Sequence, residues 1–352
     1  MRQRTRVTLE DVARRAGVSR ATASRVVRGD VAVSDQKSRA VAAAVDELRY
    51  TPNTAARALV THRTGMIAVI IPEPDELVFT DPFFARVVVA VSVLLEQWDL
   101  QLVVSFADLS GRGARTAAFL GSGAVDGAIV VSHHQINGQI ETFAAAPVPV
   151  VFIGRPVTAE PPSSWVDSDN DGGGRLAAEH LLDAGARCPA IVTGPLDMVA
   201  AQDRLRGFRG ALAEYGIDPV VLEGAFTAQS GREAAEALAP SIRSGAVDAV
   251  FLSSDLMAVA ALDAWEQVGI CVPDDVLVVS FDDSPAAERA GLSSVTNSAE
   301  CLGQQAAVML HDILDETWDG LPVTRPVTLT TRRSSRRPCP PASPGSAPST
   351  AP

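Results

Sequence analysis

Short apolar runs alternate with longer amphipathic segments from residue 66 onward, and this alternation constrains the fold more than any other feature of the chain. Continuous apolar strands separated by helices are typical of an α/β protein whose parallel sheets are covered on both faces. We predict strands at residues 67–71, 102–106, 127–131, 148–153, 190–193, 220–224, 249–252 and 277–281. Helices are predicted at residues 84–97, 173–182, 202–215, 231–243, 256–268 and 301–316.

The length of the chain favours more than one core. At 352 residues the chain exceeds the size at which a single hydrophobic core stops growing, about 250 to 300 residues. Hydrophobic residues make up 47% of the sequence, which excludes a wholly disordered chain. We therefore predict two doubly wound lobes rather than one large sheet.

The formal net charge of −12 hides a basic head on an acidic body. Residues 1–64 contain 13 Arg or Lys against 6 Asp or Glu, whereas residues 65–324 contain 12 against 36. A clustered basic segment is the electrostatic footprint of a nucleic-acid partner. The head is therefore the part of the chain expected to meet DNA.

The basic head is predicted to contain two short helices joined by a tight turn. Thr8 is placed to cap a helix over residues 9–16. Gly17 supplies the turn, and Ser19 can cap a second helix over residues 20–28. This is the spacing of a helix-turn-helix, whose second helix enters the major groove of DNA.

Arginines on the second helix are suited to reading bases. Arg20, Ala21 and Arg25 are expected on its exposed face, with Ser24 and Arg28 near the phosphates. The guanidinium of arginine reaches O6 and N7 of guanine together. The alternative is a solvated helix face without a partner, which the helix-turn-helix spacing and the local charge disfavour.

The segment after the head is predicted to be helical only when a partner holds it. Pro52 breaks the preceding helix, and Asn53 can cap a new one over residues 54–60. An isolated helix of fewer than about 12 residues is marginal in water. This helix therefore needs another surface to form.

Charged and aromatic side chains follow several predicted strands, at the edge where open α/β sheets bind ligands. Aromatic rings stack on the apolar face of a sugar while Asp and Arg bond its hydroxyls, so this combination suits a polyol. The positions that we assign to the ligand are Phe83, Phe84, Arg155, Arg204, Phe226, Asp255 and Asp282. The competing interpretation makes the two aspartates helix N-caps and the adjacent phenylalanines core residues. His133 and His134 follow a predicted strand and could also face the cleft, but the favoured interpretation makes them solvent-exposed or hydrogen-bonded loop residues.

Signals for catalysis, cofactors and export are not found in the sequence. The four cysteines form neither a C-x-x-C motif nor a Cys/His cluster, so neither a metal nor a redox site is expected. Residues 172–174 are not part of a phosphate-binding glycine fingerprint, and no nucleophile stands beside a base. No apolar run reaches about 18 residues, and the N-terminus lacks the apolar core of a signal peptide. We expect a cytoplasmic protein without cofactor, metal or membrane contact.

Longer stretches of the chain resemble one known family. The run VTLEDVARRAGVSRATASRVVRG, followed by VSDQKSRAVAAAVDELRYTPNTAARALV, is similar to the head of the lactose-repressor (LacI/GalR) family of bacterial transcription regulators. The segments DPFF, GPL…DRLRGF, SSDLMA and SFDDS extend the resemblance to about residue 332. It implies a periplasmic-binding-protein-like, two-lobed core behind the helix-turn-helix. It also makes Arg204, Phe226, Asp255 and Asp282 effector contacts and DPFF one wall of the pocket.

The resemblance assigns a hinge to the segment after the head. That hinge becomes helical on operator DNA, and Leu59 resembles the leucine that pries open a base step in the minor groove. Its alternative role is a small interdomain packing contact. The DNA-binding positions are then Thr8, Ser19, Arg20, Ala21, Thr22, Ser24, Arg25, Arg28, Asn53, Ala56, Arg57 and Leu59.

The implied organisation has a head, a hinge, an effector-binding and dimerisation domain of two lobes, and a proline-rich, disordered tail. The parts are residues 1–52, 53–64, 65–332 and 333–352, with the N-lobe at about 65–162 and 293–324 and the C-lobe at about 163–292 and 325–332. Within the core, the segment 73–80 is predicted as a loop longer than the usual one. Asn297 and Ser298 stand where many relatives have a positively charged residue and glutamine.

We therefore expect a regulator that binds operator DNA as a homodimer, represses carbohydrate-utilisation genes and is released by a small sugar-like effector. A dimer follows because one helix-turn-helix reads too few base pairs for useful specificity. A purine or other non-sugar effector, and activation instead of repression, remain open alternatives. A periplasmic sugar-binding protein would lack the basic head, and an α/β enzyme would need a nucleophile or phosphate loop.

Overall fold

The computed structural model describes residues 7–27, 33–50, 63–106, 114–135, 138–158 and 161–336. The chain divides into two compact units, Met1–Gly65 and Met66–Pro352. Each unit has its own hydrophobic core. The two units are described separately below.

The described residues of the first unit form a head with three helices. Its helices are α1 (Leu9–Ala16), α2 (Arg20–Val27) and α3 (Asp35–Leu48). They pack around a small core that includes Val12 and Ala23. The predicted capping box of Thr8 and Asp11 is confirmed, and Gly17 ends α1 at a φ of 66°, in the left-handed region that favours glycine. The helix-turn-helix expected from the sequence is therefore formed.

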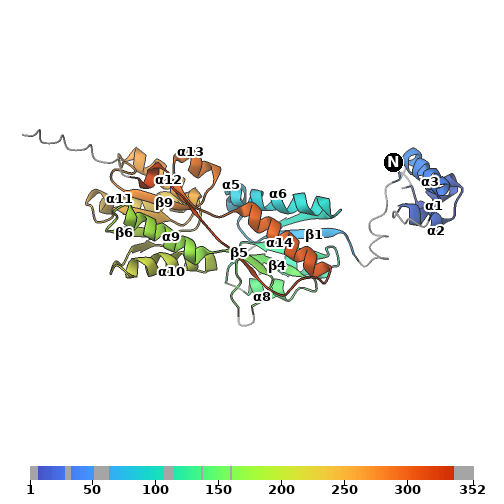
Figure 1. Cartoon of the computed structure of the whole chain (residues 1–352), viewed down its shortest axis with the longest axis horizontal. Helices are drawn as coiled ribbons and strands as arrows, with labels where there is room; N and C mark the ends of the chain where they lie inside the picture. The colour runs from blue at the N-terminus through green and yellow to red at the C-terminus, as the bar shows by residue number, and fades with distance from the viewer. Residues whose placement is uncertain are drawn as a thin grey trace, which may run out of the picture. The chain divides into compact units, whose positions relative to one another are not determined.

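In the described residues of the second unit, two six-stranded sheets form two lobes (Figure 1). The first sheet has the order β11 (Val323–Arg325), β5 (Trp165–Ser168), β4 (Val150–Ile153), β3 (Gly127–Val131), β1 (Met66–Ile71) and β2 (Gln101–Phe106). The second has the order β12 (Leu329–Thr330), β10 (Ser293–Thr296), β9 (Leu277–Asp282), β8 (Ala249–Leu252), β6 (Pro189–Val192) and β7 (Val220–Leu222). All pairings are parallel except that of β12 with β10, so the predicted parallel α/β class is confirmed.

Helices cover both faces of each sheet, which explains why the strands are apolar without interruption. In the first lobe α6 (Pro82–Gln97) and α14 (Ala299–Leu314) cover one face, and α7 (Ala114–Gly121) and α8 (Gln139–Ala144) cover the other. In the second lobe α9 (Asn170–Asp183) and α10 (Val199–Ala213) lie opposite α11 (Ala228–Arg243) and α12 (Asp255–Gln267). The shorter elements are α5 (Asp75–Thr80), α13 (Pro285–Ala290) and a 3₁₀ turn at Arg333–Ser335.

The described chain crosses between the lobes three times, from β5 to α9, from β10 to α14 and from β11 to β12. The expected lobe boundaries at residues 162 and 293 are a few residues off. β5 pairs with β4 in the first sheet, and β10 pairs with β9 in the second. These two strands have the sequences WVDS and SSVT. Because they contain polar residues, the apolar pattern did not predict them.

The segment predicted as a long loop after β1 contains a helix, α5. Pro74 precedes its first turn, where Asp75 and Glu76 complement the helix dipole. The Thr80 hydroxyl donates to the carbonyl of Glu76 at 2.7 Å. The expectation of a loop was therefore wrong for residues 75–80.

Glycines bring α9 and α10 into close contact. A Cβ at Gly174 would overlap the carbonyl oxygen of Arg204, and a Cβ at Gly207 would overlap that of Asp171. Both overlaps involve backbone atoms, so the helices could accept a side chain there only by moving apart. The contact therefore fixes the position of α10 and of the side chains that it carries.

We predict that Gly207→Ala lowers the free energy of unfolding by about 1 to 3 kcal/mol, because it overpacks this contact. Gly210→Ala, on the same helix, is the matched control, since the nearest atom to a Cβ there is the Arg175 Nη2 at 3.6 Å. Gly210→Ala should be neutral or slightly stabilising. Urea denaturation checks both, and equal stability of the two variants would contradict close packing of α9 on α10.

Candidate functional site

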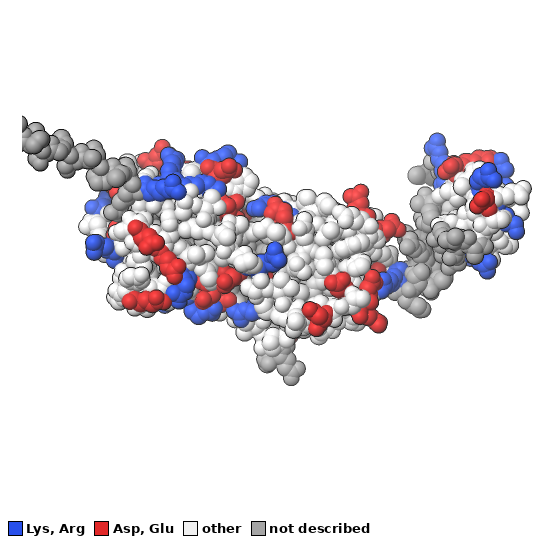
Figure 2. Space-filling view, viewed as in Figure 1, with Lys and Arg blue, Asp and Glu red and all other residues white. Residues whose placement is uncertain are grey.

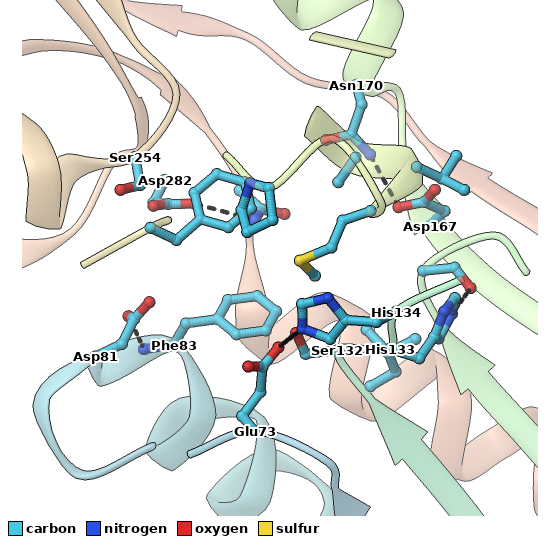
Figure 3. A pocket seen from close by; sticks show the side chains of 18 of the residues that line it. Glu73, Asp81, Phe83, Ser132, His133, His134, Asp167, Asn170, Ser254 and Asp282 are labelled. Carbon is cyan, nitrogen blue, oxygen red and sulfur yellow. Dashed lines mark hydrogen bonds and ion pairs between the residues drawn. The ribbon is translucent and has the colours of Figure 1, made fainter. Parts of the chain in front are cut away.

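A cavity lies between the two lobes, at the carboxyl ends of the parallel strands. It encloses about 880 Å³ of empty space, part of it open to solvent, and both lobes line it. Residues that directly follow strands dominate the lining, as expected for an open α/β sheet. Figure 3 shows these side chains converging from the two lobes on one space.

Arg204 of α10 is the buried cation of the cavity, with an exposed fraction of 5%. Its Nε donates to Asn170 Oδ1 at 2.9 Å, and its Nη1 donates to the carbonyl oxygen of Ser253 at 2.5 Å. The guanidinium lies 3.6 Å from the ring centroid of Phe281. Burial lowers the pKa of Arg204, while nearby acids, Asp282 foremost, oppose this. Of its five N–H donors, those without a protein acceptor can serve a ligand.

Asp282 ends β9 in an unusual backbone conformation, with a φ of 114°. Its Oδ1 accepts from Asn297 Nδ2 at 3.1 Å. Desolvation raises the pKa of Asp282 to about 8; Arg204 opposes this rise, and the charges of Asp255 and Asp81 add to it. The neighbouring Asp283 turns to a different set of partners and accepts from the Thr330 hydroxyl at 2.9 Å.

Asp255 does not line the cavity, although the sequence pattern placed it there. Its Oδ1 accepts from the hydroxyls of Ser280 and Ser294 at 2.5 and 2.8 Å, and its Oδ2 accepts from the amide of Ser284 at 2.6 Å. These bonds turn the carboxylate into the second lobe. Asp255 therefore holds the ends of β9 and β10 together, while the preceding residue, Ser254, faces the cavity.

The three predicted aromatic residues all line the cavity. Phe83 meets Phe84 edge to face, with ring centroids 5.7 Å apart, and Phe84 also belongs to the core of the first lobe. Phe226 lies on the opposite lobe, 5.6 Å from the Arg204 guanidinium. A side chain at Gly194 would overlap the Phe226 ring, so glycine there permits its position.

Arg155 links the lobes beside the cavity. Its backbone amide donates to Asp167 Oδ2 at 3.1 Å in the first lobe. Its Nη2 donates to Asp203 Oδ2 at 2.6 Å on α10 of the second lobe. The Arg155 side chain is therefore already paired with the carboxylate of Asp203. Burial raises the pKa of the other partner, Asp167, to about 6.

Several lining residues were not predicted. Asp167 lies within β5 and Asn170 shortly follows it, and the apolar pattern did not reveal this strand. Glu73 and Ser132 follow β1 and β3, and their position after buried strands was the available signal. His133 and His134 have protein partners and also line the cavity, so the structure shows both the hydrogen bonding that was expected and the cleft position that was its alternative.

The head presents the predicted base-reading residues on its second helix. Arg20, Ala21 and Arg25 are exposed, whereas Ala23 on the opposite face of α2 is fully buried. Ser19 accepts from the amide of Thr22 at 3.2 Å and so holds the start of α2. The predicted positions outside the described residues are Arg28, Asn53, Ala56, Arg57 and Leu59.

The residues that the structure describes contain no cluster of His, Cys, Asp or Glu able to hold a metal ion. None of the helices in that part of the chain is long and apolar enough to cross a membrane.

We predict that Asp282→Asn raises the melting temperature of the protein by a margin that grows between about pH 4 and pH 8. The raised pKa means that folding favours the protonated acid, so stability is lost as pH rises from the unfolded value of 3.8 through about 8. Asparagine cannot ionise, and it tolerates a positive φ. Asp263→Asn, an exposed change on α12, should show no growing margin. Melting curves across this range check the effect, and a pH-independent difference for Asp282→Asn would contradict it.

Comparison with known proteins shows similarity along almost the whole chain. Residues 8–53 match the family described as bacterial regulatory proteins, lacI family, and residues 178–335 match a periplasmic binding protein-like domain. The HTH-type transcriptional regulator CelR of Thermobifida fusca is 41% identical over 94% of this chain and 96% of its own length. A solved CelR–cellobiose complex is 37% identical, with a TM-score of 0.72 over 94% of this chain and 100% of that one.

A second solved structure shares the whole architecture. The lac repressor dimer bound to operator and the anti-inducer ONPF is 28% identical, with a TM-score of 0.84 over 95% of this chain and 100% of that one. The relative from Thermobifida fusca and this structure are both transcriptional regulators. The chain belongs to the lacI family of bacterial regulatory proteins and is a DNA-binding transcriptional regulator.

Proposed function

We propose that the protein represses carbohydrate-utilisation genes in the cytoplasm, binds its operator as a homodimer and is released by an uncharged saccharide. One observation carries the choice of effector: the buried Arg204 and the half-buried Asp282 line the same cavity as the aromatic rings of Phe83 and Phe226. A charged guanidinium donates strong hydrogen bonds to sugar hydroxyls, a carboxyl group exchanges hydrogen bonds with them, and rings pack on the apolar faces of pyranoses. The cellobiose in the solved complex of a relative supports the same class.

The charges around the cavity favour a neutral ligand. The acids of the lining are Glu73, Asp81, Asp167 and Asp282. The cations have partners already: Arg155 is paired with Asp203, and Arg204 faces several acids. A phosphate group would therefore meet a cavity lined by acids, whose cations already have acidic partners. We assign no catalytic step to the cavity, in keeping with the regulators that the chain resembles.

The α2 face supplies the operator contacts. Arg20, Ser24 and Arg25 occupy one side of the helix by its 3.6-residue period. Two copies of this face, one per protomer, would read two half-sites of a near-palindromic operator. Effector and operator then bind antagonistically, because a ligand that favours one arrangement of the lobes weakens the other by reciprocal coupling.

Exposed apolar residues on the first lobe support a homodimer. Val89 and Val93 lie one turn apart on α6 and are 61% and 50% exposed. Phe79 on α5 and Phe106 at the edge strand β2 lie 5.6 Å apart by ring centroids and are also exposed. Figure 2 shows that the visible face of the first lobe around α6 and α14 is largely uncharged. A second copy of the chain would cover this surface, which a monomer leaves in water.

We predict that neutral mono- or disaccharides stabilise the full-length protein in a thermal-shift screen, whereas sugar phosphates and purines do not. A ligand at a hundred times its Kd adds about 2.7 kcal/mol of stability. Phe226→Ala should weaken saccharide binding about tenfold through the lost stacking surface. Tyr215→Ala removes an exposed aromatic from the same lobe and should leave binding unchanged. A response to purines or sugar phosphates alone would overturn the saccharide assignment.

We predict that Arg25→Ala costs about 1 to 3 kcal/mol of operator affinity, because it removes a bidentate base contact. The operator is obtained by selection from random duplexes, and fluorescence anisotropy at fixed salt gives the affinities. Arg209→Ala, an exposed change on α10, should have no effect. An equal loss by Arg25→Ala on operator and scrambled duplex would assign Arg25 to phosphate contact instead.

A further inference from the structure

His134 joins the two lobes across the cavity. The histidine follows β3 in the first lobe, and its Nδ1 lies 2.8 Å from Oδ2 of Asp197, which follows β6 in the second lobe. Its Nε2 lies 3.2 Å from Oε1 of Glu73, which follows β1. Figure 3 shows the His134 ring inside the cavity, with its bond to Glu73. One imidazole thus connects a carboxylate of each lobe.

The contact lies away from the crossovers. The three crossovers leave the sheets at β5, β10, β11 and β12, which are the first two strands of each sheet order. β3, β1 and β6 lie further along those orders. Bonds on this side of the cavity therefore have a longer lever against opening of the lobes than bonds beside the crossovers. The backbone amide of Gln135 adds to the contact by donating to the carbonyl of Asp197 at 3.0 Å.

The two carboxylates fix the charge of the ring. Carboxylates accept hydrogen bonds and cannot donate, so both ring nitrogens must carry protons to bond Glu73 and Asp197 together. A neutral imidazole has one N–H and would leave one acid without a donor. Glu73 is tied to its place by the Ser132 hydroxyl at 2.5 Å, and Asp197 is the more exposed of the two acids. Loss of the proton therefore leaves the Asp197 carboxylate without its bond to the first lobe and weakens the contact between the lobes.

We propose that His134 is a positioning residue that holds the lobes together on the side of the cleft away from the crossovers, and that its imidazolium form is required for this. The bond works only while the lobes are closed, because Asp197 belongs to the opposite lobe. The role of the contact in effector binding rests on the proposed function of the cavity. A saccharide that closes the lobes and the proton on His134 would then stabilise the same closed state.

The surrounding groups agree with a charged His134. The ionisable groups that face it are Glu73 from the loop after β1, Asp197 from the loop after β6, and His133 on its own loop. Burial alone lowers the pKa of His134, but bonds and charges of the two acids outweigh it and raise the pKa to about 9. Burial lowers the pKa of His133 to about 4, so His133 adds no competing charge at neutral pH.

The sign of the pH dependence follows. A histidine whose pKa is raised by closure stabilises the closed lobes fully below its open-state value, which is about 6.5 for an unperturbed imidazole. That contribution is lost as pH rises through about 9. Closure should therefore take up a proton between these two values.

The first test measures His134 without any ligand. NMR titration of the histidine ring signals in the full chain, assigned with His134→Gln, should place the pKa of His134 near 9. Asp197→Asn should lower it by about one unit or more, which only contact between the lobes can produce. His311→Gln is the matched control, since His311 also faces an acid, Asp315, at 3.7 Å on α14. An ordinary pKa near 6.5, or no response to Asp197→Asn, would overturn the proposal.

The second test measures opening directly. Hydrogen exchange of peptides that cover Gln135 should accelerate about tenfold or more in His134→Gln and Asp197→Asn at pH 7, relative to the wild type and His311→Gln at the same pH. The difference should vanish near pH 10, where the wild-type ring has lost its proton. Equal exchange in all variants at pH 7 would remove the lobe-joining role.

A third test, of saccharide binding, separates the proposed effector from the proposed lobe contact of His134. The saccharide with the largest thermal shift is titrated calorimetrically into the wild type and His134→Gln at pH 7 and near pH 10. At pH 7 His134→Gln should bind it several-fold more weakly, because fewer molecules have closed lobes, and the difference should vanish near pH 10. No saccharide response, with His134 still titrating near 9, would refute the proposed effector and uphold the lobe contact. Equal saccharide affinity of the two proteins at pH 7 would uphold the effector and refute the coupling.

Discussion

The burial of the Arg204 guanidinium sets the conditions that the rest of the cleft must meet. A buried cation costs several kcal/mol unless hydrogen bonds and opposite charges surround it. Here Asn170 and the carbonyl of Ser253 take two of its donors, the Phe281 ring lies beneath it, and acids gather around it. Those acids in turn repel one another, and a ligand rich in hydroxyl groups can donate hydrogen bonds to them.

Unfavourable backbone conformations collect in the same place. Ser132, Phe226, Asp282 and Asp283 all have a positive φ, and all follow strands whose ends meet at the cavity. Each such residue costs about 1 to 3 kcal/mol unless the structure around it compensates. Three of them, Ser132, Phe226 and Asp282, line the cavity. Stability is therefore lower at the cleft than its packing alone would allow, which is typical of a binding site.

The sequence predicted those parts of the fold and site that depend on local pattern. Continuous apolar runs revealed the buried strands, and strand ends then pointed to Arg204 and Asp282. The sequence did not reveal β5 and β10, because at least half of the residues in each strand are polar. Their place in the sheets depends on neighbours distant in sequence. Asp255 was misplaced because the direction of its side chain depends on Ser280 and Ser294, which only the folded sheet brings near. His134 could not be interpreted before its partner on the other lobe was known.

The three crossovers have a consequence for how the protein is made. The last described strands, β11 and β12, are separated by only three residues in the chain, yet each completes the edge of a different sheet. Neither lobe can finish folding during synthesis until this final stretch has left the ribosome. The head, by contrast, is complete after its first few dozen residues. A ribosome that stops early would therefore release a DNA-reading head attached to two unfinished lobes. Both lobes thus depend on one short segment, β11 to β12, to complete their sheets.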